Sequence, residues 1–404
     1  MMNNFMTWID DRFPATKVWN EHLAQYYAPK NFNFWYFFGS LAMLVLVNQI
    51  LTGIWLTMNY NPSAEGAFAS IEFIRRDVEW GHLLLGMHAT GASAFFVVVY
   101  LHMFRGLIYG SFRKPRELVW IFGMIIFVLL MAEGFMGYLL PWGNMSYWGA
   151  QVIINLFSAI PIVGEEVAIW IRGDFIISGA TLNRFFALHV VALPMALLLM
   201  VFLHIVALHK VGSNNPDGID IKKLKDENGI PLDGIPFHPY YTVKDIVGVG
   251  VFLFIFCWII FFNPEMGGYF LEAPNFTPAD PLKTPEHIAP VWYFTPYYSI
   301  LKAVPNQGLG VIAMAASLVV LFFLPWLDRS PVLSMRYKSP IFKVALALFV
   351  ISFFILGYLG MKAPTEMRTL VARVCTIYYF AFFLLMPWWS QWGTTKPVPE
   401  RVTH

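Results

Sequence analysis

The stretch "HATGASAFFVVVYLH", residues His88–His102, places a histidine at each end of an apolar run without acidic or basic residues. A second stretch, "HVVALPMALLLMVFLH", residues His189–His204, has the same arrangement. Both runs are apolar enough to lie in a lipid bilayer, where an imidazole without a partner is costly. The four histidines therefore indicate that two membrane helices pair with each other or bind a shared ligand.

The composition of the whole chain is that of a membrane protein. It has 404 residues, of which 58% are hydrophobic and 13% charged, and its net charge is +2. Soluble domains carry about 25% charged residues. No basic run of the kind that marks nucleic-acid binding is present. The two cysteines form no CxxC pair, which argues against covalent c-type haem and cysteine-bound iron–sulfur clusters.

Apolar segments of about 20 residues predict transmembrane helices. We expect an all-α integral membrane protein with eight of them, at about 34–56, 83–108, 118–139, 185–208, 246–262, 304–326, 341–360 and 369–390. The segment between the third and fourth is too polar to span and is expected to form re-entrant or interfacial helices. The proline-rich and aromatic segment between the fifth and sixth is expected to be an ordered extramembrane loop.

The chain divides into five predicted regions. They are an amphipathic surface segment (1–33), a four-helix bundle with its surface helices (34–210), an inner-side loop (211–245), the remaining helices (246–390) and a tail (391–404). Lysine and arginine are twice as frequent in the connections on the membrane side that holds the amino terminus as in those on the opposite side. The positive-inside rule then places both termini in the cytoplasm, which we call the inner side.

The spacing of the histidines predicts two pairs at two depths. His88 and His102 are 14 residues apart, and His189 and His204 are 15 apart, so each pair shares one broad helix face. Each interval spans about 21–22 Å along a helix. Both helices run from the outer to the inner side. His88 should therefore meet His189 near the outer surface and His102 should meet His204 near the inner one, with a kink at Pro194 absorbing part of the mismatch.

Two histidine pairs at two depths are typical of two planar cofactors, each bound from above and below. A single intramembrane histidine is often a helix–helix hydrogen bonder, but this alternative explains four matched positions less well. Zinc fits poorly because no acidic or thiolate ligand completes a tetrahedron. Bis-histidine haem needs only two protein ligands and a wide gap between helices.

Four glycines predict that gap. Gly39 and Gly53 are 14 residues apart on the first helix, and Gly123 and Gly137 are 14 apart on the third. These helices run opposite to the histidine helices, so Gly53 and Gly137 reach the outer depth and the other two the inner depth. A missing Cβ lets a flat macrocycle approach the backbone. Close helix–helix contact is the alternative explanation.

At these motifs the sequence resembles cytochrome b of the respiratory cytochrome bc complex, the quinol:cytochrome c oxidoreductase of bacterial type. The resemblance covers nearly the whole chain and is carried by "HATGAS", "GYLLPWGNMSYWGA", "RFFALH", "HKVGSNNP", "FHPYYTVKD" and "PVWYF". It implies two non-covalent haem b groups, bL at the outer and bH at the inner histidine pair. It also implies ubiquinol or ubiquinone as substrate, and electron transfer that builds a proton gradient across the cell inner membrane.

The resemblance implies further haem contacts. Residues near the bH propionates would be Arg105, Ser111 and Trp120, and Arg184 would lie near bL. The family often has an arginine three residues before the first histidine, where this chain has Leu85.

An outer quinol-oxidising site, Qo, is implied at two places. One follows the third helix, at Gly143, Met145 and Tyr147, and the other is the tetrapeptide Pro290, Val291, Trp292 and Tyr293. Most familiar members have a glutamate in this tetrapeptide, thought to accept a quinol proton, and Val291 cannot do so.

Glu133 on the third helix is our predicted substitute, because an intramembrane carboxylate is a functional candidate. The alternative is that Glu133 is a protonated, neutral side chain that only contacts a neighbouring helix.

An inner quinone-reducing site, Qi, is implied at His209, Ser213, Asn214, Lys244 and Asp245. An imidazole and a carboxylate can supply the two protons that a reduced quinone takes up.

The resemblance implies a Rieske iron–sulfur protein, a membrane-anchored c-type cytochrome and a second copy of this chain as partners, besides membrane lipid. A proton-relay transporter and a dihaem anchor of a different enzyme are the alternatives. A transporter predicts inverted repeats and no haem absorbance. Other dihaem anchors are usually shorter and do not need the "PVWY" loop.

Overall fold

The computed structural model describes residues 2–403, and helices make up most of them. In this part of the chain, seven helical segments are long and apolar enough to cross a membrane. This confirms the predicted all-α integral membrane fold. The segments are α3 (Phe37–Thr57), α5 (Gly81–Tyr109), α6 (Glu117–Leu139), the continuous run α9 (Gly179–Ala187), η3 (Leu188–Ala192) and α10 (Leu193–Val211), α11 (Thr242–Phe262), α15 (Pro340–Gly360) and α16 (Glu366–Leu384).

The segment predicted as a single span at 304–326 is divided in the structure. Helix α13 (Gln307–Phe322) has 16 residues, and α14 (Leu324–Leu327) follows after a break at Phe323. Sixteen residues rise about 24 Å, less than the roughly 30 Å of a bilayer core. The break lies just before Pro325, which cannot donate a backbone hydrogen bond. An eighth span therefore stays a prediction.

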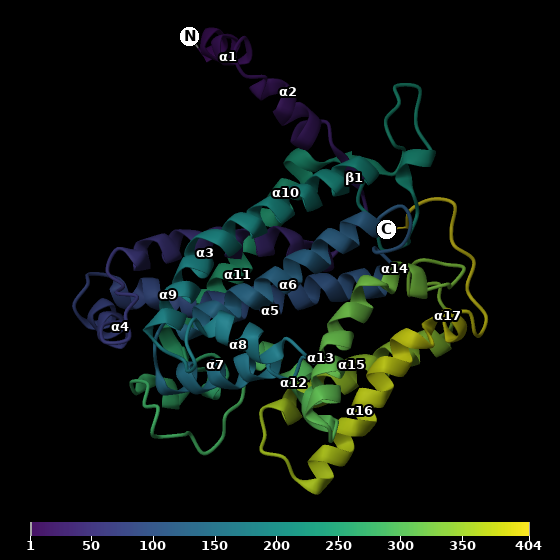
Figure 1. Cartoon of the computed structure of the whole chain (residues 1–404). Coiled ribbons are helices and arrows are strands. Elements are labelled where there is room, and N and C mark those ends of the chain that lie inside the picture. The colour runs from purple at the N-terminus through teal and green to yellow at the C-terminus, as the bar shows by residue number, and fades with distance from the viewer. Residues whose placement is uncertain (1, 404) are drawn as a thin grey trace.

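The long helices form two neighbouring groups (Figure 1). In the first, α3 packs against α5, and α6 packs against α10. In the second, α12 (Thr295–Ala303) packs against α13, α15 and α16. Short helices gather at one end of the first group, namely α4 (Ala67–Arg76), α7 (Asn144–Phe157) and α8 (Gly164–Arg172). This end is the side opposite the chain termini, and it carries the loop that follows α11.

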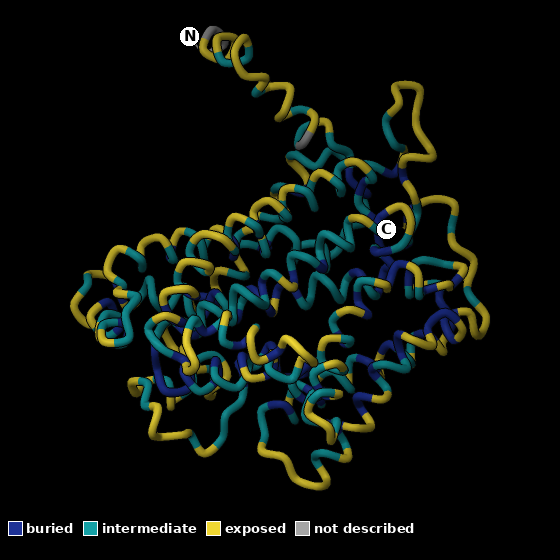
Figure 2. The backbone as a smooth tube through the Cα atoms, in the orientation of Figure 1, coloured by how far each residue is buried: buried dark blue, intermediate teal, exposed yellow. Residues whose placement is uncertain are grey.

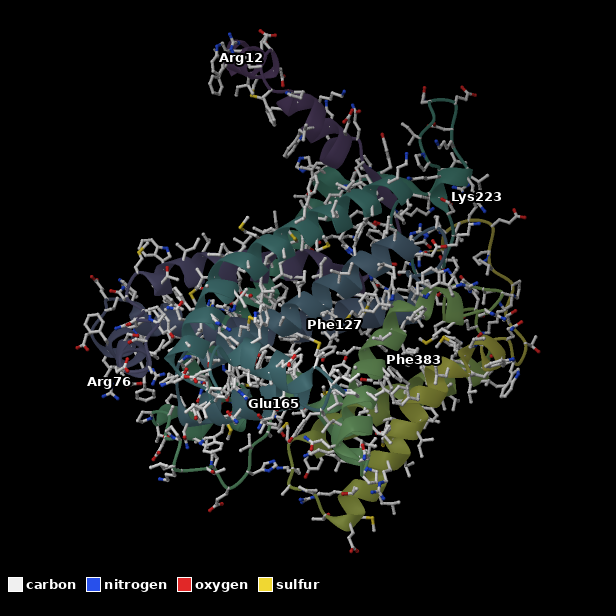
Figure 3. All side chains as sticks on the ribbon, in the orientation of Figure 1. Arg12, Arg76, Phe127, Glu165, Lys223 and Phe383 are labelled. Carbon is white, nitrogen blue, oxygen red and sulfur yellow. The ribbon has the colours of Figure 1, made fainter. Side chains whose placement is uncertain are left out.

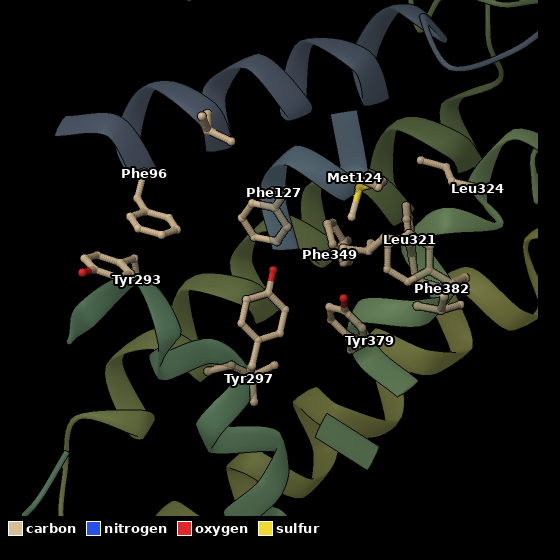
Figure 4. Packing of buried hydrophobic residues seen from close by; sticks show 14 of the residues in the cluster. Phe96, Met124, Phe127, Tyr293, Tyr297, Leu321, Leu324, Phe349, Tyr379 and Phe382 are labelled. Atoms are coloured by element: carbon tan, nitrogen blue, oxygen red, sulfur yellow. The ribbon is translucent and has the colours of Figure 1, made fainter. Parts of the chain in front are cut away.

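Buried aromatic side chains join the two groups (Figure 4). Phe96 of α5 stacks on Tyr293 with ring centres 3.8 Å apart. Phe127 of α6 contacts Tyr297 of α12, and Tyr379 of α16 continues the cluster. Because these side chains are fully or almost fully buried, they fix the position of the tetrapeptide at 290–293 relative to α5 and α6.

The outer faces of the long helices expose large apolar side chains (Figure 2). Phe202 on α10 and Phe254 on α11 are 62% and 75% exposed. Such broad apolar surfaces need lipid to cover them. Charged side chains such as Arg76 and Lys223 lie at the ends of the molecule, whereas Phe127 lies in its interior (Figure 3).

The amino-terminal region extends away from the helical body (Figure 1). It consists of α1 (Met2–Asp10), α2 (Ala15–Trp19) and η1 (Asn20–Ala24). Trp8, Phe13 and Trp19 are exposed along it, as an amphipathic surface segment requires. Strand β1 (Tyr27–Pro29) then pairs antiparallel with β2 (Gly234–Pro236).

The remaining short elements are turns of 3-10 or π-helix and one short α-helix. They are η2 (Phe34–Tyr36), η4 (Ile221–Lys223), η5 (Phe237–Tyr241), η6 (Met266–Gly268), η7 (Ala273–Phe276), η8 (Trp292–Phe294) and α17 (Met386–Trp389).

Candidate functional site

The structure brings the outer histidines together. The ring centres of His88 on α5 and His189 in η3 lie 6.2 Å apart, and the ring planes are nearly perpendicular. A metal between two imidazole nitrogens makes two bonds of about 2 Å each, which places the ring centres about 6 Å apart. The observed distance therefore fits one metal ion bound by both rings.

The inner histidines have the same separation. The ring centres of His102 and His204 lie 6.3 Å apart. Close to this pair, the Arg105 guanidinium lies over the ring of Tyr36, and its buried Nε atom has no hydrogen-bond partner among the described residues. A buried guanidinium without a carboxylate is costly unless an anionic group completes its surroundings. This arrangement fits a macrocycle that carries acidic substituents.

A π-helical turn resolves the unequal histidine spacing. Residues Leu188–Ala192, which include His189, form the π-helix η3 within the continuous helix Gly179–Val211. A π turn accommodates one more residue than an α turn, so 15 residues here place side chains as about 14 do in an α-helix. Pro194 lies just beyond this turn, in the first turn of α10, and the kink expected there stays a prediction.

Hydrogen bonds orient the outer rings. The Thr52 hydroxyl donates to the Asn48 carbonyl at 2.6 Å and therefore accepts a hydrogen bond from Nδ1 of His88 at 2.9 Å. Nδ1 of His189 donates to the Glu133 carbonyl oxygen at 3.0 Å. With Nδ1 protonated in both rings, Nε2 keeps its lone pair. These are the tautomers that bind a metal through Nε2.

The inner rings lack such partners. Neither Nδ1 of His102 nor Nδ1 of His204 has a hydrogen-bond partner among the described residues, although the backbone of Val119 lies near the His204 ring. Hydrogen bonds from the protein therefore orient the imidazole rings of the outer pair, and the inner pair lacks hydrogen bonds of this kind.

Each of the four predicted glycines faces a histidine ring at the predicted depth. A Cβ on Gly53 would lie 3.2 Å from Cε1 of His88, and one on Gly137 would lie 2.5 Å from Cε1 of His189. Gly39 and Gly123 would approach His102 and His204 in the same way, at 3.4 Å. The glycines therefore leave room for the imidazoles themselves.

The outer pair opens into a cavity of about 650 Å³. The two histidines and Gly137 line one part, and Val291 and Tyr293 line another. Most of the wall is apolar, as a flat aromatic ligand requires. One continuous space therefore connects the histidine pair with the tetrapeptide.

Comparisons with known proteins agree with this geometry. The family description "Cytochrome b/b6/petB" matches residues 23–212, and "Cytochrome b(C-terminal)/b6/petD" matches residues 278–380. Cytochrome b of Allochromatium vinosum is 62% identical over 98% of both chains. This chain belongs to the cytochrome b family.

Other relatives cover the chain as fully. Cytochrome b of Rickettsia prowazekii is 50% identical over 98% of this chain and 97% of its own. A chain of a solved "Hyperthermophilic respiratory Complex III" is 37% identical, with a TM-score of 0.88, and the match covers 95% of this chain and 98% of that one. Membership of the cytochrome b family implies that the chain binds haem b.

The cytochrome b tetrapeptide at 290–293 is docked on α5. The Trp292 indole donates to Ser93 Oγ at 3.0 Å, and the Tyr100 hydroxyl donates to the Tyr293 carbonyl at 2.6 Å. Pro290 and Val291 line a second, small cavity next to the large one. The tetrapeptide is therefore a rigid wall of the outer cavity.

The other predicted Qo residues hold the loop that follows α11. Gly143 forms an isolated β-bridge with Pro278. Met145 and Tyr147 are buried, and Tyr147 packs edge-on against Trp142. Neither of them is among the residues that line the large cavity. Their contacts stabilise the cavity wall.

Glu133 contacts a histidine of the outer pair. Its Oε1 atom lies 3.1 Å from Nδ1 of His189, and its other oxygen is buried without a partner among the described residues. This contact favours a role in positioning His189. Release of a quinol proton by Glu133 stays a prediction, which unchanged quinol oxidation in Glu133→Gln would contradict.

Several predicted Qi residues gather around Tyr26. The His209 ring packs edge-on against Tyr26 with centres 4.8 Å apart, and the Tyr26 hydroxyl lies 3.3 Å from Ser213 Oγ. Asn214 donates to the Tyr109 carbonyl at 2.8 Å and to Ser111 at 3.3 Å.

Two further Qi candidates lie in the first turn of α11. Lys244 lies over the Tyr241 ring, and the Asp245 carboxylate interacts with Ser40 of α3.

Two predicted propionate partners are engaged elsewhere. The Trp120 indole donates to the Leu321 carbonyl of α13 at 2.7 Å. Arg184 is exposed and donates to the Trp170 carbonyl. Of the four residues expected near propionates, Arg105 fits that role best.

The structure adds cavity residues that the sequence did not indicate. Arg75 of α4 lines the cavity, paired with Glu72 at 2.7 Å. Tyr138 and Glu272 also line it and are hydrogen-bonded to each other. Glu272 lies in a loop without a recognisable motif, so only its acidity in an otherwise apolar segment could have drawn attention to it.

Proposed function

We propose that this chain is the cytochrome b subunit of a proton-translocating quinol:cytochrome c oxidoreductase. The observation that carries the proposal is the pair of facing histidine couples at two depths of one helix bundle, His88 with His189 and His102 with His204. Full-length similarity to cytochrome b and to a chain of a respiratory Complex III supports it.

Each histidine couple would hold one non-covalent haem b, bL at the outer depth and bH at the inner. When bound, the two haems carry single electrons between the two sides of the membrane. Thr52 and the Glu133 carbonyl hold the outer ligands in the required tautomer. Arg105 would neutralise an acidic substituent at the inner site.

Quinol would be oxidised in the outer cavity. Val291 and Tyr293 form part of its wall, and the docked Trp292 holds that wall in place. The apolar lining keeps water from the reacting quinol, so protons leave only through polar side chains of the chain itself.

Quinone would be reduced at the inner side. His209 and Asp245 would supply protons to the carbonyl oxygens, while Lys244, Ser213 and Asn214 would orient the ring. Because protons are released outside and taken up inside, each turnover adds to the gradient. This is the Q cycle.

The partners would be a Rieske iron–sulfur protein, a membrane-anchored c-type cytochrome and a second copy of this chain. The complex would lie in the cell inner membrane with both termini of this chain in the cytoplasm. The exposed apolar faces of α10 and α11 would contact lipid.

A reduced-minus-oxidised spectrum of the purified complex tests the proposal. We expect two b-type haems per chain with two distinct midpoint potentials. His204→Leu should leave one haem, with the outer potential. A preparation without haem, or inactive in quinol:cytochrome c reduction, would contradict the proposed function.

A further inference from the structure

Quinol oxidation in an apolar cavity needs a base within hydrogen-bond reach. Both hydroxyl protons must leave as the electrons leave, and apolar walls cannot accept them. The side chain at position 291, in the wall of the outer cavity, is a valine. A base must therefore come from another part of the wall.

Glu272 provides a carboxylate in that wall. It lies in the loop that joins α11 to the tetrapeptide, and it lines the same cavity as Val291 and Tyr293. The Tyr138 hydroxyl at the end of α6 donates a hydrogen bond to Glu272 Oε2. Tyr138 also lines the cavity, one residue beyond Gly137. The carboxylate therefore lies in the wall of the cavity that the outer histidines also line.

The surroundings of Glu272 suit a base. Burial raises its pKa above that of an ordinary glutamate, and the Tyr138 hydrogen bond offsets part of that rise. A carboxylate with a raised pKa takes a proton from a weak acid more readily. Burial raises the pKa of the Tyr293 hydroxyl, and the nearby charge of Glu272 raises it further.

We propose that Glu272, positioned by Tyr138, is the carboxylate that accepts a quinol proton at the outer site. This inference rests on the proposed function. Each proton leaves a quinol hydroxyl oxygen and binds a carboxylate oxygen of Glu272, the second one after the first has passed on to water. The two electrons would go to the acceptors of the proposed function, one to the iron–sulfur protein and one to the haem held by His88 and His189. Because Glu272 belongs to an extramembrane loop, the proton then passes to water on the outer side.

Other titratable groups also line the cavity. Arg75 and Glu72 of α4 are paired with each other. Glu133 contacts His189. Besides the facing histidines His88 and His189, the remaining ones are Tyr60, His82, Tyr138, Glu265, Tyr269 and Tyr293. Among the described residues, only Glu272 combines a carboxylate in this wall with a tyrosine hydrogen bond that orients it.

The main test is Glu272→Gln in the complete complex. The amide keeps the size of the side chain but cannot accept a proton, so quinol:cytochrome c turnover should fall about a hundredfold. Both haems should keep their spectra and potentials. Glu286→Gln, an exposed glutamate of the same loop, is the matched control and should keep the wild-type rate.

A second-site variant makes the test specific. Val291→Glu in the Glu272→Gln background puts a carboxylate back into the same cavity wall. Turnover of this double variant should be at least about tenfold higher than that of Glu272→Gln alone. A purely structural defect in the loop would not be repaired by a charge at another position.

Tyr138→Phe gives a pH readout that does not depend on folding of the Glu272 variant. Loss of its hydrogen bond removes an effect that lowers the Glu272 pKa. Since the base must be deprotonated, the acid limb of the rate profile should move to higher pH.

Two results would overturn the proposal. The first is that Glu272→Gln turns over within about twofold of the wild-type rate and has an unchanged pH profile. The second is that the acid limb of the rate profile does not move in Tyr138→Phe. The wild-type complex is assayed first. Absence of quinol oxidation there would reject the proposed function itself, whereas an active wild type with an equally active Glu272→Gln variant would reject only the role of Glu272.

Discussion

The backbone of Gly137 lies directly against the imidazole of His189. A Cβ at this position would be 2.5 Å from Cε1 of the ring, closer than real Cβ atoms come to other atoms. The corresponding distance is 3.4 Å between Gly123 and His204. The helices therefore leave the least room at the outer pair, which also lines the large cavity.

Gly137→Ala should impair the outer haem site selectively. The added methyl group must displace the His189 ring, and overpacking of this kind costs about 1–3 kcal/mol. We expect the haem with the outer potential to be lost or shifted in a redox-titrated spectrum, while the inner haem is kept.

Gly250→Ala is the matched control for this change. Gly250 lies on the spanning helix α11, and a Cβ there would have no neighbour within 4 Å. Its spectrum should equal that of the wild type. Equal haem content in both variants would contradict the steric argument.

Thr52→Val should alter the outer haem without emptying its site. Valine keeps the shape but leaves the buried Nδ1–H of His88 without an acceptor, at a cost of about 1–3 kcal/mol. The imidazole then becomes a poorer electron donor, so the midpoint potential of the outer haem should rise.

Thr376→Val serves as its control. Thr376 donates to the carbonyl four residues earlier, as Thr52 does, but it lies on α16, away from the histidines. Its variant should titrate like the wild type. A potential that stays constant in Thr52→Val would show that the hydroxyl does not tune His88.

Asp233→Asn should release the carboxyl-terminal tail. Asp233 binds Arg401 at 2.8 Å and Lys30 at 3.0 Å and accepts the Val402 backbone N–H at 3.2 Å. The amide loses the charge that holds both cations. Digestion of the tail by carboxypeptidase at neutral pH should become faster, while Asp226→Asn, in an exposed turn, should digest like the wild type.

Acid should release the same tail in the wild-type protein. The hydrogen bond from Arg401 holds the pKa of Asp233 well below its usual value. A carboxylate whose pKa is lower in the folded than in the unfolded protein stabilises the fold. The stabilisation is fully present above the unfolded pKa of about 4, and it is lost as the pH falls from there through the folded pKa. Pepsin cleavage of the tail should therefore increase below about pH 4, and uniform resistance down to pH 2 would contradict it.

Much of the haem-pocket arrangement could be predicted from the sequence. The histidines of each pair face each other, and Gly53 and Gly137 lie at the outer depth, because spacing along a helix fixes both face and height. The span predicted at 304–326 appears in the structure as two helices, α13 and α14, with a break at Phe323. Hydropathy does not reveal this break, because it does not register that Pro325 lacks a backbone donor.

The amino-acid sequence by itself determined that helices cross a membrane and at which depth each histidine lies, since apolar length and helical rise are local properties. Tertiary structure alone decided the π turn at His189, the acceptors for the outer Nδ1 atoms and the meeting of Tyr138 with Glu272. Those two residues are 134 positions apart. Contacts across such a distance depend on how whole helices and loops pack, which no local pattern encodes.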